Sequence, residues 1–137
     1  MKSTDPNCIF CKIVTGQIPD YRVWEDDYFV TFLDIRPITE GHTLIVPKVH
    51  IDEVFDLPEN IYTGLFDLGR KLAPVIRQVT KCVRVGIALE GFGVPHCHLH
   101  LVPLWRGNEM DPNRAHEVSK ESLLEMQTKI KVELVKL

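Results

Sequence analysis

The sequence predicts an α+β fold: a five-stranded antiparallel sheet with one long helix and short helices near its N-terminal and C-terminal ends. Two observations predict this class. Five short segments have strand character, and most are joined by connections of only a few residues, which favours antiparallel pairing. Two longer segments instead carry apolar residues three or four positions apart, as on one face of a helix. A chain of 137 residues is long enough for one domain with a real core.

The first half of the chain predicts one short helix and three strands. Residues 6–15 read as a short helix that is closed by Gly16 and Pro19. The three segments that follow contain apolar residues in alternation and are bounded by turn residues or by proline. These strands are expected at residues 22–25, 28–34 and 42–46.

The second half predicts the longest helix and two further strands. Asp56 and Glu59 have the spacing of a capping box, an acceptor side chain followed three residues later by Glu, and should open that helix. Its apolar residues recur every three or four positions and should form one buried stripe, made of Ile61, Leu65, Leu68, Leu72, Ile76 and Val79. The strands are expected at residues 83–89 and 95–104, on either side of a turn at residues 90–93.

A second apolar stripe lies near the C-terminal end. Its residues share helical spacing and are Leu123, Met126, Ile130, Leu134 and Leu137. A single amphipathic helix of this length is marginal in water unless its apolar face is buried. We therefore expect the stripe to be buried, either on its own sheet or against a partner subunit.

Three histidines alternate with apolar residues in the segment His96-Cys97-His98-Leu99-His100. In an extended strand the three rings share one face, roughly 6.5–7 Å apart, so one bound group can touch two of them. Imidazole can act as a nucleophile, a proton carrier or a metal ligand near neutral pH. The alternative is a half-buried strand with a polar outer face, but such faces are normally filled by Thr, Ser, Lys or Glu. The pattern therefore indicates a chemical site.

Two cysteines near the start have metal-ligand spacing. Cys8 and Cys11 form a C-x-x-C pair, and His50 follows a predicted strand, so together with one histidine of the triad they would make a Cys₂His₂ zinc site. The alternatives are two incidental cysteines, or a redox pair, which the lack of a surrounding βαβ pattern disfavours. Cys82 and Cys97 have no partner spacing and are expected to be buried as small apolar residues.

Composition narrows the function classes. The net charge of −3 offers no electrostatic reason to expect nucleic acid or an anionic membrane as a partner. No apolar run approaches about 20 residues, and the start of the chain lacks a basic segment followed by a long apolar one. We therefore expect a cytoplasmic protein, in which four cysteines are thiols or metal ligands rather than disulfides.

Four separated motifs resemble the histidine-triad (HIT) superfamily of nucleotide hydrolases and transferases, and its small cytoplasmic branch in particular. They occur in the family's order at residues 7–13, 32–35, 41–48 and 96–103. The resemblance covers residues 7–105, so we expect a HIT domain there and a C-terminal extension at 106–137 that packs on the domain or on a dimer partner.

The resemblance implies a homodimeric hydrolase that acts at the α-phosphate of nucleoside monophosphate derivatives, with a purine nucleotide as ligand. Phosphoramidates, aminoacyl adenylates and dinucleoside polyphosphates are the candidate substrates. By this likeness His98 is the nucleophile that forms a nucleotidyl-histidine, and His100 contacts the phosphate or the scissile bridge. The residues with implied binding roles are Asp34 for the ribose, Ile35, Phe10 and Phe32 for the base, and His42 beside the triad.

The zinc-carrying members of the superfamily match Cys8, Cys11, His50 and His96. The resemblance therefore implies a structural zinc that ties the N-terminal segment to the strand of the triad. His96, although part of the triad, would then be held by coordination. For Asp34 a turn cap before Arg36 remains an alternative from the residues alone. His42 could likewise be only a polar residue at the start of a strand.

Two positions depart from the family pattern. Residues 92–95 lack the Ser or Thr that many small members carry just before the triad, and Leu89 stands where phosphoramidase-type members have Asn. Gly91 and Gly93 could still let backbone N–H groups approach a phosphate. The alternatives to a hydrolase are a nucleotide-binding module without significant turnover and a zinc-stabilised interaction protein.

Overall fold

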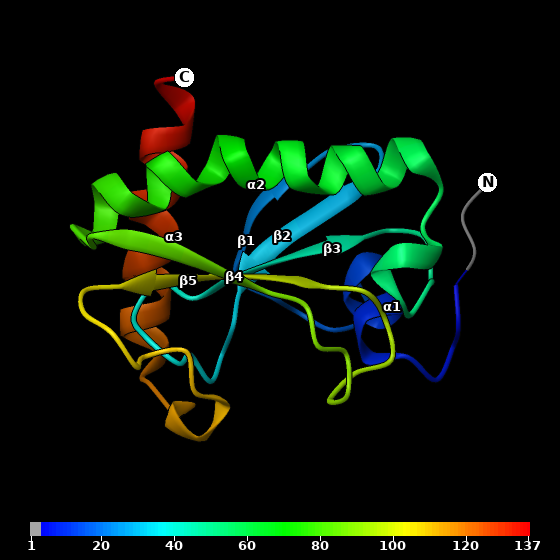
Figure 1. Ribbon diagram of the computed structural model, residues 1–137, viewed down its shortest axis with the longest axis horizontal. Coiled ribbons are helices and arrows are strands. Elements are labelled where there is room, and N and C mark those ends of the chain that lie inside the picture. The colour runs from blue at the N-terminus through cyan, green and yellow to red at the C-terminus, as the bar shows by residue number, and fades with distance from the viewer. Residues whose placement is uncertain (1–3) are drawn as a thin grey trace.

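The computed structural model describes residues 4–137, and within them the chain forms a five-stranded sheet. The strand order is β1-β2-β3-β5-β4, and every neighbouring pair is antiparallel. The strands are β1 (Arg22–Glu25), β2 (Phe29–Leu33), β3 (Thr43–Pro47), β4 (Arg84–Ala88) and β5 (Leu99–Leu104). This arrangement confirms the predicted α+β class (Figure 1).

Helices cover the sheet on both faces. The helices are α1 (Ile9–Val14), α2 (Glu59–Thr80) and α3 (Lys120–Val135), with short 3₁₀ helices at Val54–Asp56 and Pro112–Arg114. Figure 1 shows α2 running across one face of the sheet and α1 lying on the opposite side. None of the helices between residues 4 and 137 is long and apolar enough to cross a membrane.

The stripe of α2 forms the main core with the sheet. Ile61, Leu65, Leu68, Leu72 and Ile76 are buried in one cluster, as their spacing predicts, and Val79 is half-buried. Their partners from the sheet side are Ile45, Cys97, Leu99 and Leu101. Burial of this apolar area, worth about 25 cal/mol per Å², attaches α2 to β3 and β5.

The start of α2 differs from the predicted capping box. Asp56 belongs to the preceding 3₁₀ helix, and its own N–H donates to the Glu53 carbonyl. The residue before α2 is Pro58, which provides no side-chain cap, and Glu59 is the first helical residue. The capping-box prediction is wrong because the 3₁₀ turn and Pro58 together set the helix entry.

The last strand also begins later than predicted. β5 starts at Leu99, so His96 and His98 precede it and lie outside the ladder. The Cys97 N–H instead donates to the Ile51 carbonyl. The alternation of faces holds nevertheless. Cys97 and Leu99 enter the α2 core, whereas the His98 ring lies edge-on to Phe10 of α1, on the other face.

The C-terminal helix packs on its own chain. Leu123, Met126 and Ile130 are buried against Val23 of β1, Leu33 of β2 and Val75 of α2. The amide of Gln127 also donates to the Arg22 carbonyl, which covers the β1 edge of the sheet. The predicted burial of the stripe is confirmed for these three residues, and Leu134 is half-buried. It is wrong at Leu137, which is exposed beyond the end of α3.

Removal of the buried Ile130 side chain should be costly. Because this residue is 1% exposed, Ile130→Ala should lower the free energy of unfolding by about 2–5 kcal/mol through lost burial and a cavity. Val132→Ala on the exposed face of α3 is the control and should change it by less than about 0.5 kcal/mol. Urea titrations measure both values. Equal effects of the two substitutions would contradict the packing of α3 described above.

Candidate active site and candidate metal centre

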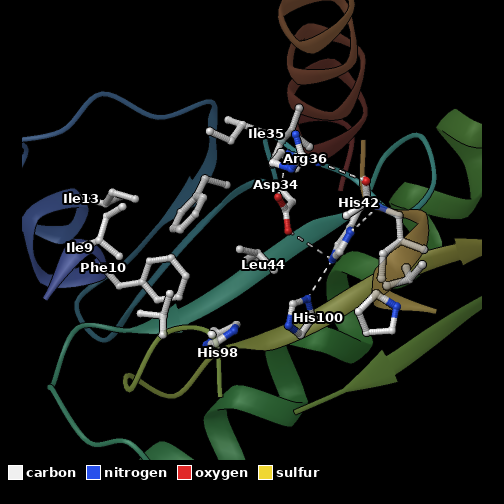
Figure 2. A pocket seen from close by; sticks show the side chains of 18 of the residues that line it. Ile9, Phe10, Ile13, Asp34, Ile35, Arg36, His42, Leu44, His98 and His100 are labelled. Atoms are coloured by element: carbon white, nitrogen blue, oxygen red, sulfur yellow. Dashed lines mark hydrogen bonds and ion pairs between the residues drawn. The ribbon is translucent and has the colours of Figure 1, made fainter. Parts of the chain in front are cut away.

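A cavity of about 500 Å³ opens on the α1 side of the sheet. Its size is that of a small-molecule site. The residues predicted for catalysis or nucleotide binding that line it are Phe10, Phe32, Asp34, Ile35, His42, Gly91, Gly93, His98 and His100. Residues far apart in the sequence therefore meet at one place, as Figure 2 shows for most of them. His96 does not line the cavity.

One end of the cavity, next to α1, is apolar. Ile9, Phe10 and Ile13 project into it from the helix, and Leu44 projects from the sheet (Figure 2). Phe32 of β2 also lines the cavity. The Phe10 ring lies edge-on to Phe32, with centroids 5.8 Å apart. Aromatic and aliphatic walls of this kind suit a flat heteroaromatic ring.

A chain of hydrogen bonds sets the tautomers of two histidines. The Ile38 N–H donates to Nδ1 of His42 at 3.0 Å, so the proton of the neutral His42 ring is on Nε2. That Nε2–H donates to Nδ1 of His100 at 2.8 Å. His100 therefore carries its own proton on Nε2. The Ile38 N–H therefore fixes the tautomer of His100 through His42. As a result, His100 presents an N–H donor to the cavity that its ring lines.

His98 has the opposite tautomer. Its Nδ1 lies 2.7 Å from the His96 carbonyl oxygen, which can only accept, so Nδ1 carries the proton. Nε2 is left with a free lone pair. The ring is 8% exposed and packs edge-on against Phe10 at 4.9 Å and His100 at 4.8 Å between centroids. A neutral, oriented imidazole with a free Nε2 is a competent nucleophile.

Burial keeps the relay histidines neutral. Burial lowers the pKa of His42 to about 4, with a smaller effect from the repulsion that a protonated His98 would exert. The pKa of His100 is also lowered to about 4, by burial and then by the repulsion that protonated His98 and His42 rings would exert. Both rings are therefore uncharged at pH 7, which is the state that the tautomer assignment requires.

Asp34 serves as a turn cap and also faces the cavity. Its Oδ1 accepts from the Arg36 N–H at 2.9 Å, which agrees with the turn-cap alternative. Its Oδ2 lies 3.7 Å from Nε2 of His42, and the residue lines the cavity. Burial raises the pKa of Asp34, although the Arg36 N–H acts in the opposite direction. A half-buried carboxylate in this position can accept hydrogen bonds from hydroxyl groups.

Asp34, His42 and His100 also group closely enough to suggest a metal site. The tautomers argue against one. A metal at this centre would need the lone pair of His42 Nε2, but that nitrogen carries the proton because Nδ1 accepts from Ile38. The group therefore acts as a hydrogen-bond relay.

Four side chains that form a second cluster suit a zinc ion. Ligand atoms of Cys8, Cys11, His50 and His96 lie within 4.8 Å of one another. Nδ1 of His96 is 3.4 Å from the Cys8 sulfur and 3.1 Å from Nδ1 of His50. Tetrahedral zinc, with bonds of about 2.0 Å to nitrogen and about 2.3 Å to sulfur, sets its ligand atoms roughly 3.3–3.8 Å apart. The separation of the two imidazole Nδ1 atoms is therefore close to the spacing that a shared zinc ion would need.

The surroundings orient these four ligands. Nε2 of His96 donates to the Pro47 carbonyl at 2.7 Å, which leaves the Nδ1 lone pair for the cluster. Nε2 of His50 lies 3.8 Å from a carboxylate oxygen of Asp5. Cys8 is the N-cap of α1, so the helix start places both sulfurs. Cys82 and Cys97 are buried outside the cluster, as expected.

The neutral relay predicts a specific pH dependence of stability. In the unfolded chain His42 has a pKa near 6.5, so between pH 6.5 and about 4 the unfolded state binds the proton more readily. The contribution of His42 to the free energy of unfolding is therefore fully present above pH 6.5. It is lost as the pH falls from 6.5 to about 4, by an amount on the order of 3 kcal/mol. The free-energy difference between wild type and His42→Gln should therefore shrink on acidification. Urea titrations at pH 7 and 4.5 measure it, and a constant difference would contradict the buried neutral ring.

Sequence reasoning missed two groups of cavity residues. Ile9, Ile13 and Leu44 line the apolar end, and the first two could have been found from their i, i+4 spacing on one face of α1. Met110, Pro112 and Ala115 come from the segment after β5. No sequence pattern indicated them, because they reach the cavity only through the path of a loop.

A family model of the HIT domain matches residues 15–106. The chain belongs to the histidine-triad family. Among histidine-triad relatives, the adenosine 5'-monophosphoramidase HNT1 of Saccharomyces cerevisiae is 32% identical over 139 residues, covering 90% of this chain and 85% of that protein. Protein hit of Bacillus subtilis is 37% identical over 102 residues, 71% of this chain and 70% of its own length.

Solved histidine-triad structures share the fold over almost the whole chain. A zinc-bound histidine triad family protein from Mycobacterium smegmatis has a TM-score of 0.81 at 31% identity, with 95% of this chain and 94% of that chain covered.

Proposed function

We propose that this histidine-triad protein is a hydrolase that cleaves nucleoside monophosphate derivatives at the α-phosphate through a nucleotidyl-histidine on His98. The observation that carries the proposal is the pair of opposite tautomers at the centre of the cavity. A free Nε2 lone pair on His98 stands beside an N–H donor on His100. The relative HNT1, a monophosphoramidase by name, supports the same chemistry.

The cavity offers a place for each part of a nucleotide. A purine base fits the apolar end between Phe10, Phe32 and Ile35, and the ribose hydroxyls donate to Asp34. The α-phosphate then lies at His98. Gly91 and Gly93, which also line the cavity, allow backbone N–H groups to approach it.

The reaction proceeds in two displacements at phosphorus. His98 Nε2 forms a bond to phosphorus as the bond to the leaving group breaks, and the leaving group takes up a proton from solvent. Water then attacks phosphorus, releases a proton, and frees His98 with the nucleoside monophosphate. The Nε2–H of His100 donates to a phosphate oxygen or to the bridging atom as negative charge develops there.

We also propose that Cys8, Cys11, His50 and His96 hold a structural zinc ion. Four protein ligands would fill a tetrahedral shell and leave no position for a substrate. His96 then anchors the segment before β5 and so helps to position His98, without itself touching the substrate. The zinc-bound relative from Mycobacterium smegmatis supports this proposal.

A homodimer through the β4 edge of the sheet is part of the proposal. α3 covers the β1 edge, whereas β4 is the other outer strand, and Val83 and Ile87 are exposed along it. A free edge with exposed apolar side chains favours strand pairing with a second copy. Light scattering should give the mass of two chains.

A nucleotide-binding module without significant turnover is the second candidate. Leu89 and Gly93 favour it, because they stand where related hydrolases carry polar residues. Fluorescence release from an adenosine phosphoramidate bearing a fluorogenic amine separates the two. If the protein is a hydrolase, it should release the fluorophore over multiple turnovers, and this activity should require His98. Thermal stabilisation by AMP without any turnover would instead favour the binding module.

A further inference from the structure

A carboxylate that has no role in the proposed function lies at the base end of the cavity. Asp20 belongs to the segment between α1 and β1, and it lines the cavity together with its neighbours Ile18 and Pro19. Its side chain is 11% exposed. A carboxylate this buried beside apolar residues is costly unless its oxygens have partners, so the bonds that Asp20 makes, and those it still can make, decide what it does.

Asp20 lies one strand farther from the nucleophile than Asp34. The sheet order is β1-β2-β3-β5-β4, with Asp20 just before β1, Asp34 just after β2 and His98 just before β5. The Leu33 N–H donates to the Tyr21 carbonyl at 3.1 Å, which holds the segment of Asp20 beside the start of the Asp34 loop. A nucleotide with its phosphate at His98 and its ribose at Asp34 therefore extends its base toward Asp20.

The Arg22 guanidinium fixes the orientation of this carboxylate. Nε of Arg22 donates to Oδ2 of Asp20 at 3.0 Å, and Nη2 donates to Oδ1 at 3.2 Å. The same Nη2 donates to the Ile13 carbonyl at 2.8 Å. Ile13 projects from α1 into the cavity (Figure 2), so the carboxylate is held next to the α1 wall. Arg22 is not among the residues that line the cavity, which leaves Asp20 to meet a base there.

The bonds from Arg22 limit what else Asp20 can accept. A carboxylate has about four lone-pair sites, and the side-on guanidinium takes one on each oxygen, on the side where the two point the same way. The two sites that remain point apart. Asp20 can therefore accept a single N–H group from a ligand, but not a parallel pair of them.

Purine bases differ in what they present at C6. Adenine has an amino group there, which donates, whereas hypoxanthine and guanine have a carbonyl oxygen, which can only accept. A carbonyl oxygen against a carboxylate loses hydration without gaining a hydrogen bond. The donors of guanine are N1–H and the 2-amino group, which form a parallel pair. Adenine is thus the purine whose donor matches the free lone pairs of Asp20.

We propose that Asp20 accepts a hydrogen bond from the 6-amino group of adenine and so makes the base end of the cavity selective for adenine over 6-oxopurines. This inference rests on the proposed function, which places the ribose at Asp34 and the α-phosphate at His98. Asp20 is then a specificity-determining residue that does not touch the reacting atoms. The preferred substrates are adenosine 5'-phosphoramidates rather than those of inosine or guanosine.

Three nucleoside 5'-monophosphates whose bases differ at C6 test the selection. They are AMP, with an amino group, purine riboside 5'-monophosphate, with hydrogen, and IMP, with a carbonyl oxygen. Isothermal titration calorimetry measures the Kd of each. The Kd should increase in the order AMP, purine riboside 5'-monophosphate, IMP, and IMP should bind at least about tenfold more weakly than AMP.

Asp20→Asn should remove this preference. The amide keeps the shape of the carboxylate and one acceptor oxygen for Arg22, and its NH₂ group can donate to the carbonyl oxygen of IMP. The ratio of the Kd for IMP to the Kd for AMP should therefore fall at least about tenfold. A merely structural role of Asp20 would weaken the binding of all three nucleotides alike and leave this ratio unchanged.

Asp27→Asn is the matched control. Asp27 is exposed in the turn between β1 and β2 and is not among the residues that line the cavity. The substitution makes the same change of charge and should keep the wild-type ratio. Thermal melts show that both variants are folded.

The outcomes separate the inference from the proposed function. Equal Kd values of wild type for AMP and IMP overturn the inference alone, as does a wild-type ratio in Asp20→Asn. Failure of wild type to bind any of the three nucleotides overturns the nucleotide site of the proposed function and the inference with it. A preference for AMP that depends on Asp20, without hydrolysis of adenosine 5'-phosphoramidate, supports the inference and overturns the hydrolase.

Discussion

His98→Ala should abolish hydrolysis of nucleoside phosphoramidates while the protein remains folded. The substitution removes the only triad ring with a free Nε2 in the cavity, and with it the covalent step. Loss of a nucleophile of this kind should lower kcat by about 10³-fold or more. Steady-state turnover of the fluorogenic adenosine phosphoramidate measures the effect, and retention of a tenth of wild-type kcat would contradict the assignment.

His116→Ala is the matched control for this variant. His116 is exposed and lies outside the residues that line the cavity. Its removal should leave kcat within about twofold of wild type, since it touches none of the reacting groups. Thermal melts of both variants distinguish lost chemistry from lost folding.

Cys8→Ala should cause a large loss of stability. It removes a proposed zinc ligand that is also the N-cap of α1. Purified wild type should contain about one zinc per chain, and the variant should contain far less. The loss of the metal should cost about 3 kcal/mol or more and lower the Tm by about 10 °C for a domain of this size.

Cys82→Ala provides the control for the metal prediction. Cys82 is a buried free thiol like Cys8, but it lies outside the cluster. The substitution should leave the zinc content unchanged and lower stability only by the small cost of a lost buried sulfur. Wild-type protein purified without chelator and free of zinc would refute the structural zinc.

The fold was predictable because its two periodicities are local. The pattern of neighbouring residues was enough to predict the strands at residues 22–25 and 28–34 and the apolar stripe of α2. The structure confirms these elements. The boundaries depend on less local contacts. β5 begins only at Leu99 because the segment before it bonds to Ile51 instead of to a neighbouring strand.

The sequence was sufficient to predict most of the residues of the site, but not the tautomers that determine their chemical roles. Alternation placed His98 and His100 on one face, and the family resemblance pointed to Asp34 and His42. The tautomers depend on a bond between His42 and His100, which are 58 positions apart, and on the Ile38 N–H. No sequence pattern reports such a contact. The part of the cavity wall that follows β5 was missed for the same reason, since Met110 reaches the cavity only through tertiary packing on Gly86.

Mass spectrometry of the protein quenched during turnover tests the central claim most directly. Wild-type protein mixed with an adenosine phosphoramidate and stopped within the first turnovers should carry one adenylyl group. Peptide mapping under conditions that preserve phosphorus–nitrogen bonds should place that group on His98. An adduct on another residue would contradict the account, as would full turnover with no adduct at any quench time.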